Sequence, residues 1–265
     1  MYEFEFHRPG TLAEASGAVK SASEGKLLAG GMTLLPTLKQ RLASPSDLVD
    51  LSAIAELKGI KVDGNAVLIG AMTRHADVAG SAEIRSKIPA LADLARHIGD
   101  AQVRNRGTLG GSIANNDPAA DYPAACLGLG ATIRTNEREI SADDFFVGLF
   151  ETALNEGEII TSISFPVPEK AAYMKFANPA SRYAMVGVLV AKTSSGVRVA
   201  VTGAGADGVF RVSEMESALA SNFSPDAVAG ISVDPSGLNT DIHASAEYRA
   251  HLIGVMAKRA VQACG

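Results

Sequence analysis

The sequence has few of the residues that usually hold metal ions. It contains two cysteines, five histidines and no tryptophan in 265 residues. An iron–sulfur cluster needs about four thiolates, and structural zinc sites use clustered Cys and His. The two cysteines, Cys126 and Cys264, lie far apart in the sequence and cannot supply either site. Any redox chemistry of this chain must therefore come from an organic cofactor, and we interpret both cysteines as small buried hydrophobic residues.

Positive charge and long apolar runs are also scarce. The formal net charge is −5, which argues against a nucleic-acid partner, since phosphate binding needs a concentrated basic face. No apolar run reaches the roughly 18 to 20 residues that a membrane span requires. The start, "MYEFEFHRPG", is charged before any apolar stretch, so it does not resemble a signal peptide. These features predict a globular, cytoplasmic protein without a membrane span.

The order of predicted elements indicates an α+β protein in three parts. Residues 1–55 form a β-α-β-α-β unit, in which "TLAE" at 11–14 is a capping box that begins the first helix. Residues 56–168 begin with a hairpin at Asp63-Gly64 and end with the strand "EIITSISFP". Between these we expect short helices, a long polar loop from residue 100 to 120, and a helix near 121–129. Residues 169–265 contain successive antiparallel strands, a second capping box "SEME" and a terminal helix.

One nucleotide-binding motif is present but lies in the wrong context. "GAGADG" at 203–208 fits the G-x-G-x-x-G pattern and follows a strand. A dinucleotide fingerprint also needs a helix that opens within the glycines, and here the next helix cap is Ser213, after an extended stretch. We interpret this motif as a turn between antiparallel strands.

Two glycine doublets give a stronger signal. Gly30-Gly31 stand between a strand and a helix start, and Gly110-Gly111 stand in the long polar loop. Successive amides without side chains can form a concave nest that holds an oxyanion. Two facing nests could therefore hold the two phosphates of a dinucleotide, whereas the simpler alternative is two tight turns. Small polar residues nearby favour the nests, and they could also bind ribose or ribityl hydroxyls: Thr33, Ser112, Asn116, Asp117 and Asp121.

Four segments carry a resemblance to a known family: "LLAGGMTLLPTLKQRLA", "IGAMTRHADV", "QVRNRGTLGGSIANNDPAADYPA" and "KFANPASRYAMVGV". They resemble the FAD-binding medium subunit of the molybdenum hydroxylases, the xanthine dehydrogenase and aerobic carbon monoxide dehydrogenase family. The likeness is greatest to the carbon monoxide dehydrogenase type and runs nearly end to end. It implies a PCMH-type FAD-binding fold: two α/β subdomains, 1–55 and 56–168, and a C-terminal α+β flavoprotein domain, 169–265, with an antiparallel sheet and helices.

The resemblance also implies a set of FAD-binding residues. The segments 27–35 and 108–113 would wrap the pyrophosphate through backbone amides, Asp121 would bind a cofactor hydroxyl, and Asp117 would accompany it. Ile98 matches an apolar position near the adenine, whereas Ile160 and Lys175 match positions near the flavin, and Tyr183 resembles an aromatic lid beside the isoalloxazine. The family often has His or Ser where this chain has Met32, which contributes mainly its amide. The members of the two wrapping segments are Leu27, Leu28, Ala29, Gly30, Gly31, Met32, Thr33, Leu34, Leu35, Thr108, Leu109, Gly110, Gly111, Ser112 and Ile113.

In this family the flavin subunit works within a larger complex. The resemblance implies a small partner subunit with [2Fe-2S] clusters and a large partner subunit with molybdopterin, assembled as a dimer of heterotrimers. FAD would collect electrons from the iron–sulfur partner and pass them to an external acceptor, with no catalytic triad or metal on this chain. Two alternatives stay open: a free-standing FAD-dependent reductase of the same fold, and a non-catalytic nucleotide-binding module. Arg104 and Arg106, just before the second doublet, could aid phosphate binding, face the iron–sulfur partner or simply be solvated, and we choose none of these roles for them.

Overall fold

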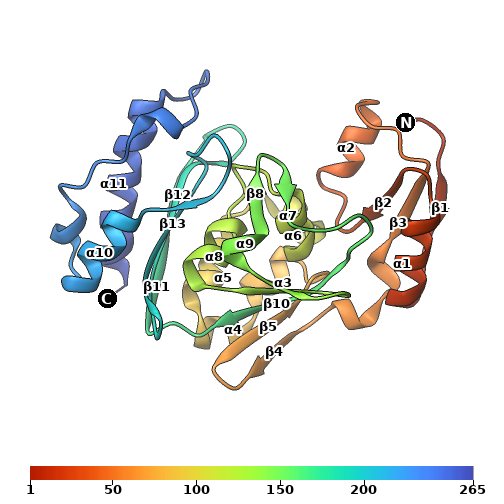
Figure 1. Ribbon diagram of the computed structural model, residues 1–265, viewed down its shortest axis with the longest axis horizontal. Helices are drawn as coiled ribbons and strands as arrows, with labels where there is room; N and C mark the ends of the chain where they lie inside the picture. Colours follow the sequence, from red (N-terminus) through yellow and green to blue (C-terminus); the bar gives the residue numbers. More distant parts are fainter. Residues whose placement is uncertain (265) are drawn as a thin grey trace.

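The computed structural model describes residues 1–264 and arranges its three larger sheets in a row, with the two chain termini in the outer parts (Figure 1). The first sheet is parallel, in the order β1-β3-β2, and packs on α1. The predicted capping box forms, because Thr11 Oγ1 accepts from the Glu14 amide at 3.3 Å and the Glu14 carboxylate accepts from the Thr11 amide. The elements are β1 (Glu5–His7), α1 (Leu12–Ser21), β2 (Gly25–Leu28), α2 (Leu34–Lys39) and β3 (Asp47–Asp50).

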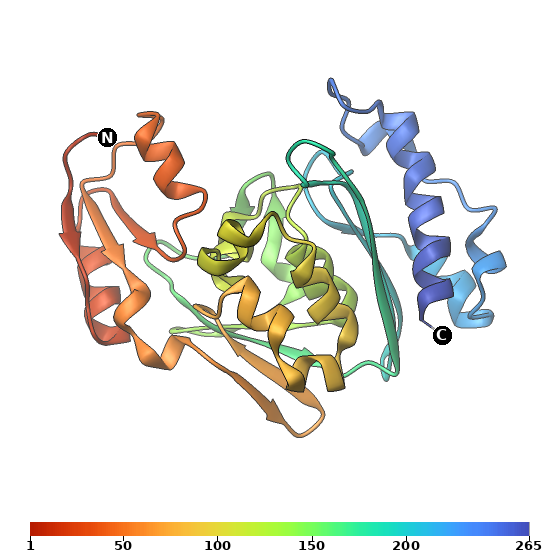
Figure 2. The same cartoon turned by 180° about the vertical axis from the view of Figure 1, so that it is seen from behind.

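The central part contains a five-stranded antiparallel sheet in the order β4-β5-β10-β6-β7. The chain leaves this sheet after β5, runs through six helices and returns at β6; Figure 2 shows these helices from behind. Its strands are β4 (Ile60–Asp63), β5 (Ala66–Gly70), β6 (Thr132–Thr135), β7 (Glu139–Ser141) and β10 (Ile160–Pro166). Its helices are α3 (His75–Gly80), α4 (Ala82–Lys87), α5 (Pro89–Arg96), α6 (Ala101–Arg106), α7 (Leu109–Asn115), α8 (Tyr122–Leu129) and α9 (Ala142–Phe145), and a small hairpin follows, β8 (Phe146–Gly148) and β9 (Glu151–Thr152).

The prediction of a long loop at residues 100–120 is wrong for most of that range. It contains two short helices, α6 and α7, each begun by a polar N-cap: Asp100 accepts from the Val103 amide at 2.9 Å, and Thr108 accepts from the Gly111 amide at 3.2 Å. Caps of this kind satisfy amides that the first helical turn leaves free. The glycine content masked the helices, because their stability comes from caps and packing rather than from helix propensity.

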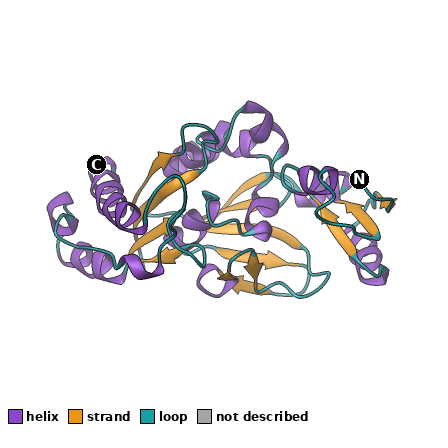
Figure 3. Ribbon diagram, turned by 90° about the horizontal axis from the view of Figure 1, so that it is seen from above, coloured by secondary structure: helices purple, strands orange, loops and turns teal. Residues whose placement is uncertain are grey.

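The last part is a four-stranded antiparallel sheet covered on both faces. Helix α11 packs on β11 and β12, while α5 and α8 of the central part pack on β11 and β13, so this sheet lies between two helical layers (Figure 3). "GAGADG" joins the antiparallel strands β13 and β14, which confirms its interpretation as a turn. The elements are β11 (Lys170–Ala177), β12 (Ala184–Thr193), β13 (Gly196–Thr202), β14 (Phe210–Arg211), α10 (Ser213–Ser221) and α11 (Ala246–Ala263).

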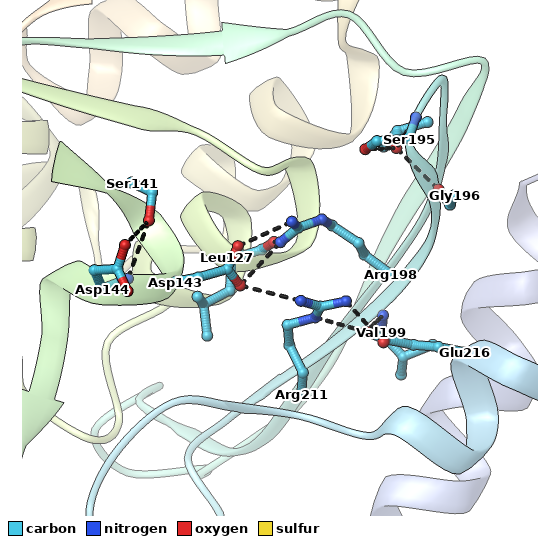
Figure 4. A network of polar contacts seen from close by, with 11 residues as sticks. Leu127, Ser141, Asp143, Asp144, Ser195, Gly196, Arg198, Val199, Arg211 and Glu216 are labelled. Atoms are coloured by element: carbon cyan, nitrogen blue, oxygen red, sulfur yellow. Dashed lines mark hydrogen bonds and ion pairs between the residues drawn. The ribbon is translucent and has the colours of Figure 1, made fainter. Parts of the chain in front are cut away.

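A polar network fastens the last sheet to the central part (Figure 4). Asp143, which lies on α9, accepts from Arg198 of β13 at 2.9 Å and from Arg211 of β14 at 3.1 Å. Glu216 accepts from Arg211 and from the Val199 amide. The capping box predicted at 213–216 does not form for this reason: the Glu216 carboxylate is already bound to these donors, and α10 begins without a side-chain cap.

The two boundaries predicted from the sequence, 55/56 and 168/169, separate the three larger sheets from one another. That each part is a separate folding domain stays a prediction. Cys126 is fully buried and Cys264 partly buried, as expected, and burial raises the pKa of the Cys264 thiol to about 11. Among residues 1–264, no helix is long and apolar enough to cross a membrane.

Candidate functional site: a cleft at the glycine doublets

A cleft of about 490 Å³ is lined by residues from all three parts of the chain. The loop after β2 forms one wall, and the helices α6 and α7 form the facing wall. The loop before β12 closes one end with Tyr183, and residues 158–160 line the region next to the first sheet. Both glycine doublets line the same cleft, so the structure brings together the two motifs that the sequence singled out.

The first doublet leaves a run of backbone amides without partners. Gly31 has φ 74°, a left-handed conformation that a side chain rarely adopts. Within residues 1–264, no hydrogen bond uses the amides of Gly30, Gly31, Met32 or Thr33. Successive free N–H groups at a turn of this kind are the arrangement that binds a phosphate oxyanion. The first of the two predicted phosphate-binding nests therefore has suitable hydrogen-bond donors.

Gly30 also allows the two walls of the cleft to approach each other closely. A Cβ at Gly30 would lie on the Arg106 carbonyl oxygen and 2.8 Å from the Gly107 Cα, both backbone atoms that cannot swing away. A Cβ at Gly111 would meet the Ala29 Cβ at 3.1 Å. The glycines thus let the first loop touch the α6–α7 corner, and this contact forms the floor of the cleft.

The second doublet is not the free nest that the sequence predicted. Gly110 and Gly111 lie in the first turn of α7, and their amides donate to Ala71 O at 2.8 Å and to Thr108 Oγ1 at 3.2 Å. The Ser112 amide donates to Thr108 O. These donors are used inside the protein, so α7 offers the cleft its Ser112 hydroxyl and its glycine surface rather than free amides. The expectation of two facing nests is therefore corrected to one nest facing a helix.

Asp121 lies on the cleft wall at the end near Tyr183 and is held by two neighbours. Its carboxylate accepts from the Tyr173 hydroxyl at 2.5 Å and pairs with Lys175 Nζ at 2.9 Å, and both charged side chains are almost completely buried. Burial raises the pKa of Asp121, while the Lys175 ammonium and the Tyr173 hydroxyl oppose that rise. Lys175 does not line the cleft, so its role here is to position Asp121.

Tyr183 projects from a tight loop that connects β11 to β12. The loop is held by Asn178, whose amide donates to Tyr183 O at 2.8 Å and whose carbonyl accepts from the Arg182 amide. Arg182 has φ 63°, an uncommon conformation for a residue with a side chain. Tyr183 remains 50% exposed and lines the cleft. An aromatic ring held at the cleft mouth is compatible with the predicted lid.

The two ends of the cleft bear on two further assignments. Lys175 Nζ also donates to His97 O at 3.1 Å, so Ile98 lies at the same end as Asp121 and Lys175. Ile160 follows Ile159, which packs in the core of the first sheet, at the other side. The assignment of Ile98 to the adenine, and of Ile160 and Lys175 to the flavin, stays a prediction. Ile98 and Lys175 nevertheless contribute to the walls or support of this cleft.

Several predicted residues contribute no side chain to the cleft. Leu28 and Leu35 pack around Gly31, whose added Cβ would meet them, and Leu109 and Ile113 belong to the central core. Asn116 points away and donates to Gly148 O and Glu151 O. The predicted residues that do line the cleft are Leu27, Ala29, Gly30, Gly31, Met32, Thr33, Leu34, Ile98, Thr108, Gly110, Gly111, Ser112, Asp117, Asp121, Ile160 and Tyr183.

Sequence reasoning missed other residues that line the cleft, above all His75 and Asn115. Asn115 directly precedes Asn116, the residue that the sequence favoured. The rotation of α7 about its axis decides which of the two side chains lines the cleft. His75 is buried between Gly107 and the Tyr122 ring, with its ring centroid 5.2 Å from that of Tyr122. Burial, followed by the charge of Arg104, lowers the pKa of His75 to about 4. A neutral imidazole therefore lines the cleft at neutral pH, and the sequence contained no signal for it.

Comparison with known proteins identifies the family of this chain. Residues 2–168 match the family described as FAD binding domain in molybdopterin dehydrogenase. This chain belongs to that family. The chain is 35% identical over 279 residues to the carbon monoxide dehydrogenase medium chain of Hydrogenophaga pseudoflava, covering 98% of this chain and 96% of the relative. It is 36% identical to the glyceraldehyde dehydrogenase medium chain of Sulfolobus acidocaldarius, covering 97% of both chains.

Solved structures agree over the whole length. A chain of carbon monoxide dehydrogenase from Hydrogenophaga pseudoflava superposes with a TM-score of 0.89, covering 99% of this chain and 97% of that one at 35% identity. Quinoline 2-oxidoreductase from Pseudomonas putida 86 also gives 0.89, with 28% identity and coverage of 99% and 96%. The α+β FAD-binding fold and the identification as an FAD-containing oxidoreductase component are thereby confirmed.

The cleft fits an FAD on features of its own. Its volume lies within the roughly 300–1,000 Å³ typical of small-molecule sites, and its lining comes from all three parts of the chain. The free amides of the 30–33 loop suit a pyrophosphate, while Ser112, Asn115 and Asp121 offer polar partners for hydroxyl groups. Among residues 1–264, no cluster of three or more His, Cys, Asp or Glu could hold a metal ion.

Proposed function

We propose that this chain is the FAD-carrying electron-transfer subunit of a molybdenum-containing hydroxylase. Bound FAD supplies the redox chemistry, taking electrons from a [2Fe-2S] partner subunit and passing them to an external acceptor. The chain's own groups bind and orient it: the 30–33 amides hold the pyrophosphate, Asp121 accepts from a hydroxyl, and Tyr183 covers the isoalloxazine. Partner subunits with [2Fe-2S] clusters and molybdopterin complete the complex.

The observation that carries this proposal is the geometry of the first doublet. Four consecutive amides without partners face a helix across a cleft that only glycine at position 30 allows to be so narrow. A free-standing reductase would in addition need a proton donor for its substrate. Of the groups that line the cleft, His75 is a poor proton donor, because its lowered pKa of about 4 keeps the imidazole uncharged at neutral pH.

Native copurification tests the proposal. The chain is tagged in its own cells, isolated without denaturant, and its flavin, iron and molybdenum contents are measured together with the identity of bound chains. We expect one FAD per chain and two copurifying subunits, one with iron and one with molybdenum. Yellow protein that never associates with a metal-containing chain would instead favour the free-standing reductase. Colourless protein that binds no added FAD would refute both.

We also propose that the complex works in the cytoplasm. Both thiols of the chain, Cys126 and Cys264, are free, as is usual for proteins of reducing compartments. Immunoblots of fractionated cells would check this location, and recovery of the chain in an extracytoplasmic fraction would contradict it.

A further inference from the structure

A second, smaller cavity of about 300 Å³ lies behind the first glycine loop. It shares Ala29, Gly30, Met72 and Thr108 with the FAD cleft, so the two cavities adjoin at the first glycine loop. Its remaining lining is Arg8, Ser52, Lys58, Arg74 and Arg106. Four of these side chains are cationic and none of the lining residues is acidic, although the whole chain has a net charge of −5.

The cations differ in what already occupies them. Arg8 has an acidic neighbour, with its Nε 3.5 Å from Asp50, and Lys58 Nζ donates to Ser52 O at 2.6 Å. Arg74 and Arg106 have no ion pair and no side-chain hydrogen bond anywhere in residues 1–264. All four cations are exposed residues that line one cavity, where they raise the local positive potential, and a bound anion would lower it.

We propose that this second cavity binds the phosphate of a small anionic ligand, at a site distinct from the FAD cleft. Guanidinium groups present parallel N–H donors that match phosphate oxygens in pairs, which makes arginine the usual residue at such sites. The volume lies at the lower limit of small-molecule sites. Six of its nine lining residues have polar or charged side chains, so we expect the phosphate to supply most of the recognition. This inference goes beyond the proposed function.

The position of the site gives its ligand a route to the cofactor. Arg106 touches Gly30 through its backbone carbonyl, and Arg74 and Thr108 are paired as neighbours in an isolated antiparallel bridge. A ligand held by both arginines would therefore fasten the segments that form the floor of the FAD cleft. We expect it to slow FAD release without touching the flavin.

Calorimetric titration of the FAD-loaded protein with inorganic phosphate and with pyrophosphate tests the site. The variant is the double substitution Arg74→Gln and Arg106→Gln, and its control is Lys61→Gln with Arg259→Gln, which removes the same charge from exposed positions elsewhere. We expect wild type and control to bind pyrophosphate, and the arginine variant to bind at least about ten-fold more weakly, since each charge-assisted contact is worth about that much. The 450 nm flavin absorbance should be equal in all three.

Three results would overturn the site. The first is that FAD-loaded wild type binds neither probe. The second is that only flavin-free protein binds them, because the cations would then serve the FAD phosphates. The third is that the arginine variant binds pyrophosphate normally but no longer captures its partner subunit, which would make the cavity a docking point for an acidic protein surface. Protein that never takes up FAD would refute the proposed function, but phosphate binding that depends on the two arginines would still support this site.

Discussion

Replacing Gly30 with alanine tests the physical basis of the cleft most directly. Gly30 has no positive φ, so the added methyl causes no backbone strain of its own. It would lie 2.8 Å from the Gly107 Cα, where ordinary contact begins at 3.4 Å, and it would overlap the Arg106 carbonyl. Because both neighbours are backbone atoms, the loop must move by more than half an ångström, and overpacking of this kind costs about 1–3 kcal/mol.

The empty protein can relieve this overlap by opening the loop, but a bound pyrophosphate needs the loop in place. The cost therefore falls mainly on cofactor binding, and about 1–3 kcal/mol corresponds to a roughly 5- to 150-fold increase in the Kd for FAD. Fluorescence titration of flavin-free protein would measure it. Gly17→Ala is the matched control, since Gly17 lies on the exposed face of helix α1 and a Cβ there meets nothing within 4 Å. An FAD affinity for Gly30→Ala within two-fold of the control would refute this account of the doublet.

Three other predictions concern the walls of the cleft. Lys175→Met should lower the free energy of unfolding by about 3–5 kcal/mol, because it leaves a buried carboxylate unpaired; Lys192→Met, in an exposed pair on the same sheet, should cost under about 1 kcal/mol in the same urea titration. Tyr183→Leu should change the flavin reoxidation rate more than the flavin content, whereas Tyr248→Leu, similarly exposed on α11, should change neither. His75 has a pKa lowered from 6.5 to about 4, so the unfolded chain binds the extra proton first as pH falls. The stability it contributes should be complete above pH 6.5 and decline by about 3 kcal/mol towards pH 4, and urea titrations should show a shallower decline in His75→Leu.

Sequence patterns were reliable where local chemistry decides the structure. The Thr11 cap, the turn at Asp63-Gly64 and the rejection of "GAGADG" as a dinucleotide motif depend on residues within a few positions of one another. The position of the first doublet between a strand and a helix has the same local origin. These features were predictable because no distant part of the chain competes for the groups involved.

Predictions failed where distant residues compete for the same atoms. The carboxylate of Glu216 could cap its own helix, but Arg211 and the Val199 amide bind it instead. Thr73 is a cap-type residue just before α3, yet its hydroxyl bonds to Gly59 across the sheet edge, and α3 begins after Arg74 without a side-chain cap. Likewise the sequence does not indicate that Lys175 pairs with a carboxylate 54 positions away.

The two glycine doublets look equivalent in the sequence but have different structural roles in the fold. Gly31 turns the chain so that successive amides stay free, which costs hydrogen bonds in the empty protein and leaves donors for a ligand. Gly110 lets α7 pack directly on Ala71, where any Cβ would collide, and its amide is satisfied there. One doublet therefore provides the donors and the other provides the rigid surface that holds them at a fixed distance from the opposite wall. If both walls consisted of free amides, neither wall would have the internal hydrogen bonds that fix the width of the cleft.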